Sequence, residues 1–198
     1  MHPPWEPFLV ALDLRGRDCL VVGGTTEAEE KARGLLACGA RVTVVAPTVT
    51  EGLRALHREG SVAWEARALA PSDTEGSLAV VLSTERDEAL SARLQAEARA
   101  RGFLLCCLDQ PGFSNFANVA VVRRGLLSVG FSTGGAAPAV VKRLREGLSS
   151  ALDARFQRWL EAVAALRQAT APERRRAVLS EALRGFRLEV KLRLPPGA

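Results

Sequence analysis

The segment from residue 17 to residue 33 constrains this chain most, because a strand, a glycine turn and a helix follow one another there directly. An apolar run, CLVV at residues 19–22, ends in Gly23-Gly24 and passes into a stretch rich in Ala, Glu and Arg. Glycines let the backbone turn tightly beside a pyrophosphate, whose charge is stabilised by the unpaired N–H groups at a helix N-terminus. The segment therefore predicts the start of a dinucleotide-binding unit.

The glycine pattern differs from G-x-G-x-x-G/A at its centre. Read from Gly23, the middle position is Thr25 and the third is Ala28. Thr25 either narrows the phosphate pocket or contributes a hydroxyl hydrogen bond, and the alternative for the whole motif is an ordinary βα turn. The next strand is followed by Ala46-Pro47-Thr48 and not by the acidic residue that binds a ribose hydroxyl, so this feature does not separate NAD from NADP.

Alternating strand and helix patterns cover the first half of the chain. They predict a Rossmann-like parallel sheet flanked by helices, and thus an α/β fold. Residues 66–76, rich in Pro, Ser and Asp, are predicted to form a loop. The expected strands are 17–22, 41–45, 61–65, 78–83 and 103–107, and the expected helices are 27–37, 49–59 and 87–101.

The pattern changes after residue 107. Apolar segments at 119–123 and 126–131 flank Arg124-Gly125 as the strands of a hairpin would. Helices are expected from Pro138 onward, then over 151–168 and 172–188. These changes divide the chain into residues 1–110, 111–148 and 149–198. Because a short apolar hairpin is not stable alone, it predicts self-association across a dimer interface.

Composition favours a compact soluble protein, with 198 residues of which 47% are hydrophobic and 25% charged. No apolar run approaches the roughly 20 residues of a membrane span, and no signal segment is apparent, so we expect a cytoplasmic protein. The four cysteines show no C-x-x-C spacing and are expected to be small buried hydrophobes, the alternatives being a metal cluster or a disulfide. With only His2 and His57, no histidine-based metal site is expected.

Charge is distributed unevenly along the chain. Residues 1–109 carry 12 basic and 16 acidic side chains, net −4, whereas residues 110–198 carry 15 basic and 6 acidic ones, net +9. A basic half of this kind attracts polyanions, either nucleic acid or a polycarboxylate metabolite, although any one cluster can also be a solvated helix face. No helix-turn-helix, zinc-finger or aromatic RNA-binding signature accompanies the charge, so no nucleic-acid partner is expected.

Asp109 lies just past the carboxyl end of the last predicted strand of the sheet. Open α/β sheets bind ligands at the carboxyl ends of their strands, so a carboxylate there faces the cofactor crevice and can serve as a general base. The alternative is an Asp that merely starts an Asp-x-Pro turn.

Taken together, the motifs resemble those of the precorrin-2 dehydrogenase family, the dehydrogenase module of siroheme synthase. The resemblance runs in unbroken order from about Trp5 to Leu148. It implies NAD-dependent oxidation of precorrin-2, an anionic tetrapyrrole, to sirohydrochlorin by a homodimer with a Rossmann-like domain, a dimerisation hairpin segment and a small helical C-terminal domain. The motifs that carry it are Gly23-Gly24, Glu30-Lys31-Ala32-Arg33, GARVTVVAP at 39–47, Asp109, Ser132-Thr133-Gly134-Gly135-x-x-Pro138 and Arg143-x-Arg145-Glu146.

The resemblance also implies roles for individual residues. Asp109 matches the catalytic aspartate, and Thr133 matches a hydroxyl that is phosphorylated in some relatives. The implied cofactor contacts are Gly23, Gly24, Thr25, Thr26, Glu27, Pro47, Thr48 and Thr84. The implied substrate contacts are Asn118, Ser132, Thr133, Gly134 and Gly135, and no metal-binding residue is implied.

Three departures from the family pattern leave two alternatives open. Thr25 replaces a glycine, Asn118 lies where relatives have an aromatic residue, and Ala137 replaces a serine. The alternatives are a bifunctional dehydrogenase and ferrochelatase, since some members also insert ferrous iron, and a non-catalytic protein that binds a tetrapyrrole or dinucleotide.

Overall fold

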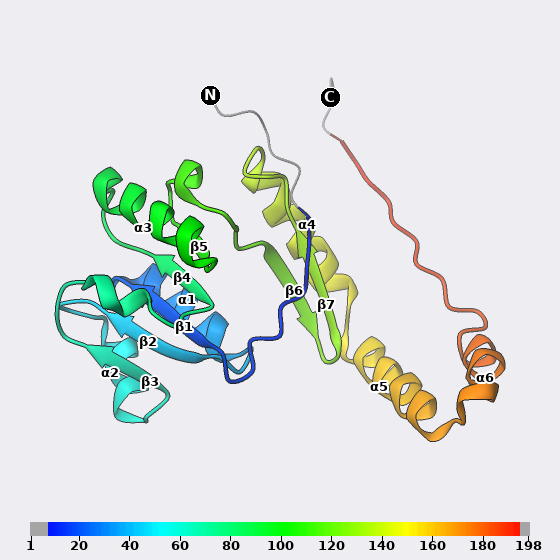
Figure 1. Cartoon of the computed structure of the whole chain (residues 1–198). Coiled ribbons are helices and arrows are strands. Elements are labelled where there is room, and N and C mark those ends of the chain that lie inside the picture. Colours follow the sequence, from blue (N-terminus) through cyan, green and yellow to red (C-terminus); the bar gives the residue numbers. More distant parts are fainter. Residues whose placement is uncertain (1–7, 195–198) are drawn as a thin grey trace. The chain divides into compact units, whose positions relative to one another are not determined.

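The computed structural model of this chain describes residues 8–194, which belong to two compact units. Unit 1 is Met1–Asn118 and unit 2 is Val119–Ala198. Because no charged residue lies between 110 and 118, the boundary also separates the acidic part of the sequence from the basic part. Figure 1 shows the elements of both units, and each unit is described below by itself.

Unit 1 contains a five-stranded parallel sheet. Its strands follow the order β3-β2-β1-β4-β5, so the chain reverses its direction of growth at β1. That reversal creates the topological switch point at which open α/β sheets bind ligands. The strands are β1 (Asp18–Val22), β2 (Arg41–Val45), β3 (Val62–Glu65), β4 (Ala79–Leu82) and β5 (Leu104–Cys107).

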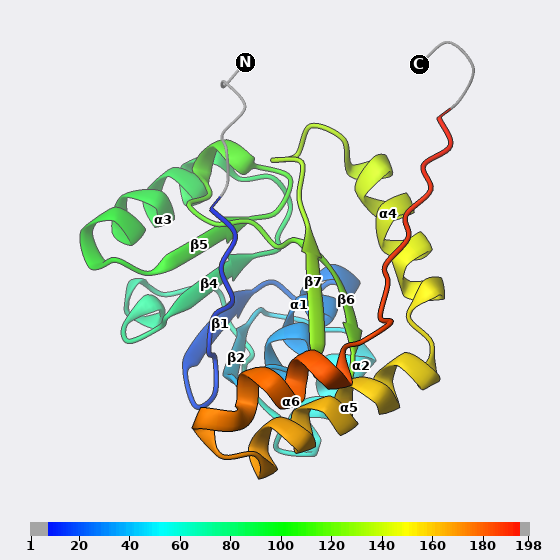
Figure 2. The ribbon, with the colours of Figure 1, turned by 90° about the vertical axis from the view of Figure 1, so that its right-hand side faces the viewer.

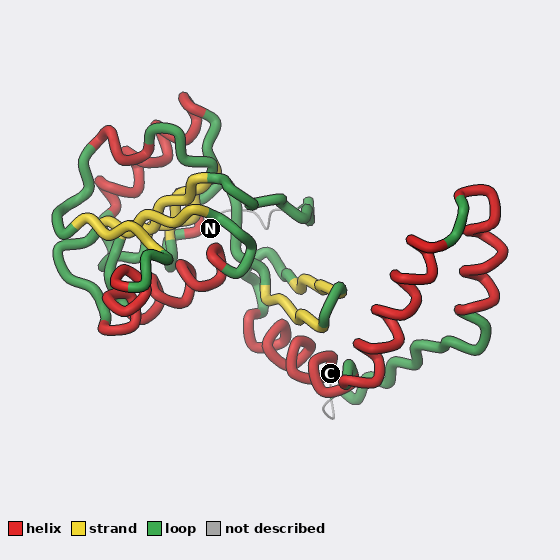
Figure 3. Tube along the Cα trace, turned by 90° about the horizontal axis from the view of Figure 1, so that it is seen from below, coloured by secondary structure: helices red, strands yellow, loops and turns green. Residues whose placement is uncertain are grey.

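Helices cover both faces of this sheet, as Figure 3 shows. Cys19 and Val21 of β1 belong to the core under α1 (Thr26–Leu36) and α2 (Glu51–Arg58). Leu20 and Val22 belong to the core under α3 (Glu88–Arg101). Alternate residues of a strand point to opposite faces, so the continuous apolar run of β1 reflects burial on both sides. Only a short 3₁₀ turn, η1 (Pro71–Thr74), interrupts the loop between β3 and β4.

Unit 2 begins with an antiparallel hairpin of β6 (Ala120–Arg124) and β7 (Leu127–Phe131). Helix α4 (Pro138–Ala151) packs against the hairpin. The Arg124 guanidinium joins the two by donating to the carbonyl oxygens of Ser149 and Leu152 at 3.0 and 2.8 Å. Cations suit this place because the last carbonyls of a helix have no partner within it.

Two further helices complete unit 2. Helix α5 (Ala154–Ala169) and helix α6 (Arg175–Ala182) lie side by side, joined through η3 (Pro172–Arg174) (Figure 2). The ring of Trp159 on α5 stacks on that of Phe186 with 4.7 Å between centroids. Beyond Phe186 the chain is extended up to residue 194 (Figure 1).

The structure confirms the α/β class and the five predicted strands, and it corrects the predictions for unit 2. The helix expected over 172–188 ends at Ala182, because Gly185 adopts φ +83° and residues 187–194 are extended. The hairpin turn lies at Gly125-Leu126, one residue later than expected. The division into three parts at 110 and 148 stays a prediction beside the two units.

Two findings concern the expected membrane and cysteine properties. No helix within residues 8–194 is long and apolar enough to cross a membrane. Cys19, Cys106 and Cys107 are buried in strands, and burial raises the pKa of their thiols above the ordinary value. These three thiols therefore act as small neutral core side chains.

Candidate functional site

The glycine turn after β1 is fixed by its neighbours on both sides. A Cβ added at Gly23, whose φ is +122°, would lie 2.0 Å from the carbonyl oxygen of Ser83, the residue after β4. A Cβ at Gly24 would lie 1.9 Å from the carbonyl oxygen of Thr48, in the loop after β2. Both glycines are therefore required by the close approach of three loops at the switch point, whether or not a ligand is bound.

Thr25 is the N-cap of α1, which explains how a threonine replaces the middle glycine. Its backbone is extended, with φ −76° and ψ 171°, so no left-handed conformation calls for glycine there. Its hydroxyl oxygen accepts from the N–H of Ala28 at 3.2 Å and lies 3.3 Å from the hydroxyl of Ser83. The Thr25 hydroxyl therefore caps α1 and reaches the end of β4, and a hydrogen bond from it to a phosphate stays a prediction.

The loop after β2 is tied to the same turn. The N–H of Thr50 donates to the carbonyl oxygen of Gly24 at 3.0 Å, and the indole of Trp64 on β3 donates to the carbonyl oxygen of Ala46 at 2.9 Å. These two bonds hold Pro47 and Thr48, both exposed, beside the N-terminus of α1. Thr84, which is also exposed, follows Ser83 at the end of β4.

A carboxylate that the sequence reasoning missed links the first turns of α1 and α2. Glu29 accepts from the Thr50 hydroxyl at 2.6 Å and from Arg33 at 2.8 Å. The Thr50 hydrogen bond, followed by Arg33, holds the pKa of Glu29 below its ordinary value. Gly52 leaves room for this carboxylate, because a Cβ there would lie 2.1 Å from it. The i, i+4 spacing of Glu29 and Arg33 was the sequence signal that could have indicated half of this network.

Asp109 lies in a turn directly after β5. The turn is closed by the N–H of Gln110, which donates to the carbonyl oxygen of Cys107 at 3.2 Å. Asp109 has φ +58°, and no other residue between 8 and 194, glycines aside, has a positive φ. Its side chain is exposed and thus directly available to a ligand. The structure thus shows Asp109 as a turn residue with an exposed carboxylate, and its role as a general base stays a prediction.

Two polar residues of the segment after β5, Gln110 and Asn118, have distinctive surroundings. Gln110 is only 6% exposed, and its side-chain carbonyl oxygen has no hydrogen-bond partner among the described residues. Asn118, at the end of unit 1, donates to the sulfur of Cys106 at 3.6 Å. Nothing in the sequence indicates that Gln110 is buried, because Gln beside Pro111 and Gly112 has the composition of an exposed turn.

The carboxyl ends of four strands therefore carry the residues predicted for the cofactor and for catalysis. Parallel strands end at one edge, so the turns after β1, β2 and β4 are adjacent, and the Asp109 turn lies beyond β4 at β5. Three features fit a dinucleotide pyrophosphate at α1. The glycines of the turn have no room for a side chain, the helix N-terminus at Thr26 and Glu27 is exposed, and the Thr25 hydroxyl caps its own helix.

The predicted substrate residues Ser132, Thr133, Gly134 and Gly135 lie in unit 2, between β7 and α4. The Thr133 hydroxyl accepts from the N–H of Ala137 at 2.9 Å, in place of a side-chain cap from Ala137 itself. Both glycines have positive φ, +60° and +87°. These features let the chain turn sharply before it enters α4. That Ser132–Gly135 form one site with Asp109 and Asn118 stays a prediction.

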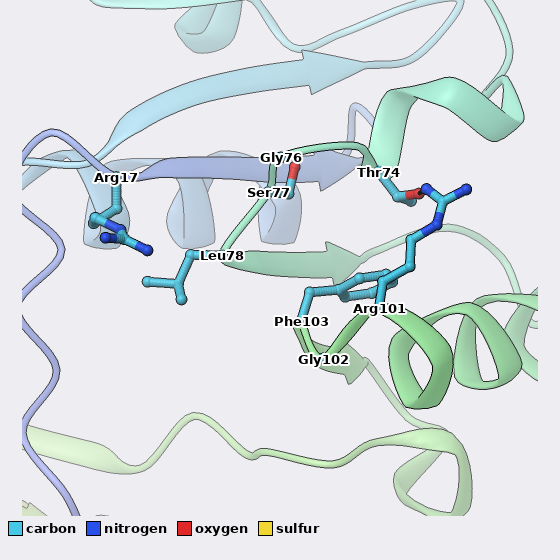
Figure 4. A pocket seen from close by; sticks show the side chains of 8 residues that line it. All are labelled: Arg17, Thr74, Gly76, Ser77, Leu78, Arg101, Gly102 and Phe103. Atoms are coloured by element: carbon cyan, nitrogen blue, oxygen red, sulfur yellow. Dashed lines mark hydrogen bonds between the residues drawn. The ribbon is translucent and has the colours of Figure 1, made fainter.

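A cavity of about 260 Å³ in unit 1 lies at the edge of the sheet opposite the glycine turn and Asp109, and Figure 4 shows its lining. Arg17, Leu78 and Phe103 border it from the amino ends of the strands, and Arg101 donates to the Thr74 hydroxyl at 2.9 Å. Open α/β sheets bind ligands at the opposite edge, so the position of this cavity does not support a role in cofactor binding.

A family model described as "Putative NAD(P)-binding" matches residues 10–120, more than half of the chain. The chain belongs to this NAD(P)-binding family. The match covers the strands, the glycine turn and Asp109, and it extends two residues into unit 2. The family match therefore supports a dinucleotide, NAD or NADP, as the cofactor of this chain.

The curated relatives of this chain are siroheme synthases, which is a more specific description than NAD(P)-binding. It is 38% identical to a siroheme synthase of Gluconacetobacter diazotrophicus over 196 residues, covering 92% of the chain and 40% of the relative. It is 37% identical to siroheme synthase 1 of Aeromonas salmonicida over 146 residues, covering 74% of the chain and 31% of the relative. The chain therefore spans well under half the length of these relatives.

A solved structure named "SirC, precorrin-2 dehydrogenase" matches with a TM-score of 0.74 and 29% identity over 88% of both chains. Together with the siroheme synthases, it confirms the predicted resemblance to the precorrin-2 dehydrogenase family and the Rossmann-like fold. The roles of individual site residues stay predictions.

Proposed function

We propose that this chain is an NAD-dependent dehydrogenase that oxidises precorrin-2 to sirohydrochlorin. The observation that carries the proposal is the single edge of the sheet at which the glycine turn, the α1 N-terminus and the exposed Asp109 occur together. The match to SirC over 88% of both chains supports the choice of substrate. When bound, the nicotinamide cofactor accepts a hydride from the tetrapyrrole, and the accompanying proton leaves the substrate as the new double bond forms.

The residues of the chain have two roles in this proposal, cofactor binding and proton transfer. The N–H groups of Thr26 and Glu27 at the start of α1 bind the pyrophosphate, and the Gly23-Gly24 turn allows its close approach. Pro47, Thr48 and Thr84 border the nucleotide from the loops after β2 and β4. The Asp109 carboxylate accepts the proton, and its exposed side chain allows the proton to pass to solvent.

We further infer a homodimer in the cytoplasm, with the Ser132–Gly135 turn and Asn118 contacting the tetrapyrrole. Among the hydrophobic residues of unit 2 that the structure describes, only Val122 and Leu152 are buried. The hydrophobic core of this unit is therefore too small to stabilise the unit by itself. A partner subunit would supply the missing contacts. NAD is proposed over NADP from the family resemblance alone, and parallel titrations with both dinucleotides test that choice.

The decisive experiment compares wild type with Asp109→Asn in anaerobic turnover of enzymatically generated precorrin-2 with NAD, followed by sirohydrochlorin absorbance. Asn is the matched variant because it tolerates a left-handed backbone and removes only the carboxylate. We expect kcat to fall about 10²- to 10⁴-fold, as for loss of a general base, with unchanged NAD affinity.

Other outcomes would contradict specific parts of the proposal. Full turnover by Asp109→Asn would show that the carboxylate is not the proton acceptor. Tight tetrapyrrole binding by wild type without any NAD-dependent oxidation would identify a carrier and not an enzyme.

A further inference from the structure

The cavity at the amino ends of β1, β4 and β5 has no part in the proposed dehydrogenase reaction. Its volume is about 260 Å³, and the residues directly before the three strands, Arg17, Leu78 and Phe103, border it. The rest of its lining belongs to the loop from η1 to β4 and to the end of α3. Pockets for drug-sized ligands have volumes of roughly 300–1,000 Å³, so this cavity suits a smaller molecule.

The charge of the cavity lining is positive. Arg17 lies on one side and Arg101, the last residue of α3, on the other (Figure 4). The apolar side chains of Leu78 and Phe103 lie between them (Figure 4). Within the described part of the chain no Asp or Glu lines the cavity, although residues 1–109 as a whole carry net −4. The cavity is therefore a local basic site in the acidic part of the sequence, and such a field attracts anions.

The guanidinium of Arg17 is available to a ligand. It makes no hydrogen bond or ion pair with any residue between 8 and 194, and its side chain is exposed. The adjacent acidic residue, Asp18, is engaged by Arg41, which donates to both carboxylate oxygens at 2.7 and 2.6 Å. A guanidinium has five N–H donors and no acceptor, so all five donors of Arg17 can bind an anion.

Arg101 is held in place without close neutralisation of its charge. Its guanidinium donates at 2.9 Å to the hydroxyl of Thr74, which is buried and lies 3.0 Å from the Glu97 carboxylate. The carboxylate of Glu75 lies 3.9 Å from a nitrogen of Arg101, which is too long for a hydrogen bond, and both side chains are exposed. Arg101 is therefore oriented by the Thr74 hydroxyl, and its other donors are free for an anion.

Neutral donors of the lining also lack acceptors. The backbone N–H groups of Gly76 and Phe103 and the Ser77 hydroxyl donate to no group among residues 8–194. A Cβ added at Gly76 would meet nothing within 4 Å, so the space beside it is open. Backbone N–H and hydroxyl groups next to arginines are the donors that bind the oxygens of phosphates and carboxylates in proteins.

We propose that this cavity binds a small oxyanion, a phosphate or a short carboxylate, between Arg17 and Arg101. The planar guanidinium matches both groups, because it can donate two parallel hydrogen bonds to two oxygens of either one. The site lies at the edge of the sheet opposite the glycine turn, so it is separate from the pyrophosphate position proposed at α1. It goes beyond the dehydrogenase activity and does not depend on it.

Amide NMR shifts of the ¹⁵N-labelled full-length chain locate the anion. The chain is titrated with inorganic phosphate and, separately, with succinate, while chloride keeps the ionic strength constant. We expect saturable shifts at Gly76, Ser77 and Phe103. A response to phosphate alone identifies a phosphate site, to succinate alone a carboxylate site, and to both a general oxyanion site. Shifts confined to Thr26 and Glu27 would place the anion at α1 and overturn the proposal, as would the absence of saturation with either anion.

Matched variants separate the site from the net charge of the chain. Arg17→Gln and Arg101→Gln each remove one charge from the lining. Arg99→Gln is the control, because Arg99 is an exposed residue of α3 that does not border the cavity and makes no hydrogen bond or ion pair within residues 8–194.

We expect the two lining variants to raise the Kd of the responding anion at least about tenfold, and Arg99→Gln to change it less than about twofold. Arg17→Gln should also keep the urea midpoint of wild type, because Arg17 has no bond within the described fold to lose. An unchanged Kd in Arg17→Gln would overturn the proposal. Equal increases in Arg17→Gln and Arg99→Gln would show a response to net charge alone and would overturn it too.

Discussion

Asp109 combines an exposed carboxylate with a left-handed backbone, φ +58°, at the edge where ligands of parallel sheets bind. A left-handed conformation is free of penalty for glycine, tolerated by Asp and Asn, and costs an alanine about 1–2 kcal/mol. We therefore expect Asp109→Gly to be at least about 1 kcal/mol more stable than Asp109→Ala in urea unfolding, with wild type between them.

Turnover should not follow this stability order. All variants that lack the carboxylate, Asp109→Gly included, should lose turnover to a similar extent. Activity that instead tracked the free energy of unfolding would mean that Asp109 serves the turn alone. Asp109→Ala by itself cannot separate the two roles, because it removes the carboxylate and strains the backbone together.

The sequence could place Asp109 but not describe its surroundings. Its position after a buried apolar strand followed from the pattern alone. The burial of Gln110 depends on the packing of a turn onto its own sheet, and so do the side-chain bonds that Ser114 and Asn115 make to β5. These contacts join residues 7 to 10 positions apart without any periodicity, so no sequence pattern records them.

At the scale of elements, we expect alanine substitutions at two glycines near α1 to have opposite effects on the free energy of unfolding, because only Gly24 lies where the loops approach closely. Gly24→Ala would place a Cβ 1.9 Å from the carbonyl oxygen of Thr48, and we expect it to lower the free energy of unfolding by about 1–3 kcal/mol. It should also weaken dinucleotide binding, because the loop carrying Pro47 and Thr48 must move away.

Gly34→Ala is the matched control, because Gly34 lies inside α1 with nothing within 4 Å of an added Cβ. The helix propensity of alanine should then raise the free energy of unfolding by about 0.5–1 kcal/mol. Urea unfolding and dinucleotide titration of both variants provide the measurements. Equal effects of the two substitutions would argue against the loop contact as the cause.

The Glu29 link between α1 and α2 predicts a pH dependence of stability. Its pKa is held below the ordinary value of 4.5, first by the Thr50 hydroxyl and then by Arg33. A carboxylate with a lowered folded-state pKa stabilises the fold above its unfolded pKa, and this stability is lost as the pH falls through the folded pKa. The free energy of unfolding of wild type should therefore exceed that of Glu29→Gln by less below pH 4.5 than at neutral pH.

Urea midpoints of both proteins, measured in steps from about pH 7 to about pH 3, test this linkage. The difference between the two proteins should be constant near neutrality and shrink in acid. A difference that stays constant over the whole range would show that the Glu29 charge does not contribute to folding.

The elements that the sequence predicted well are those buried on both sides or amphipathic over several turns. All five strands of unit 1 were found because each is a continuous or near-continuous apolar run between turn residues. The end of α6 was misjudged because Leu179, Leu183 and Phe186 have a helical spacing that continues past Ala182. Gly185, with φ +83°, ends the helical course, and a two-residue alternation of charged and aliphatic side chains begins just after it.

At the scale of the whole molecule, the two units differ in how much of their structure they can support alone. Unit 1 has two clusters of buried residues, one on each face of its sheet. Unit 2 has Val122 and Leu152 as the buried hydrophobic residues in its described part. The sequence indicated the change of pattern after residue 107, but the size of the core on either side depends on the three-dimensional packing.

The charge of the molecule follows the same division and leads to a prediction about substrate capture. Residues 110–198 carry net +9 and residues 1–109 net −4. If precorrin-2, a polycarboxylate, is the substrate, its approach to the basic unit is accelerated by a field that salt screens. We expect kcat/KM for precorrin-2 to fall at least about tenfold between roughly 0.01 M and 1 M salt, as the Debye length shortens from about 30 to about 3 Å.

Dinucleotide binding provides the internal reference for this salt dependence. The predicted cofactor residues belong to the acidic part of the chain, so salt should weaken NAD binding much less than it lowers kcat/KM for precorrin-2. A neutral osmolyte at matched osmolality should leave both quantities unchanged, which separates charge screening from changes in water activity. If the two quantities instead fell in parallel with salt, the basic half would have no specific part in capturing the tetrapyrrole, and its arginines would have to be explained by solvation or by assembly.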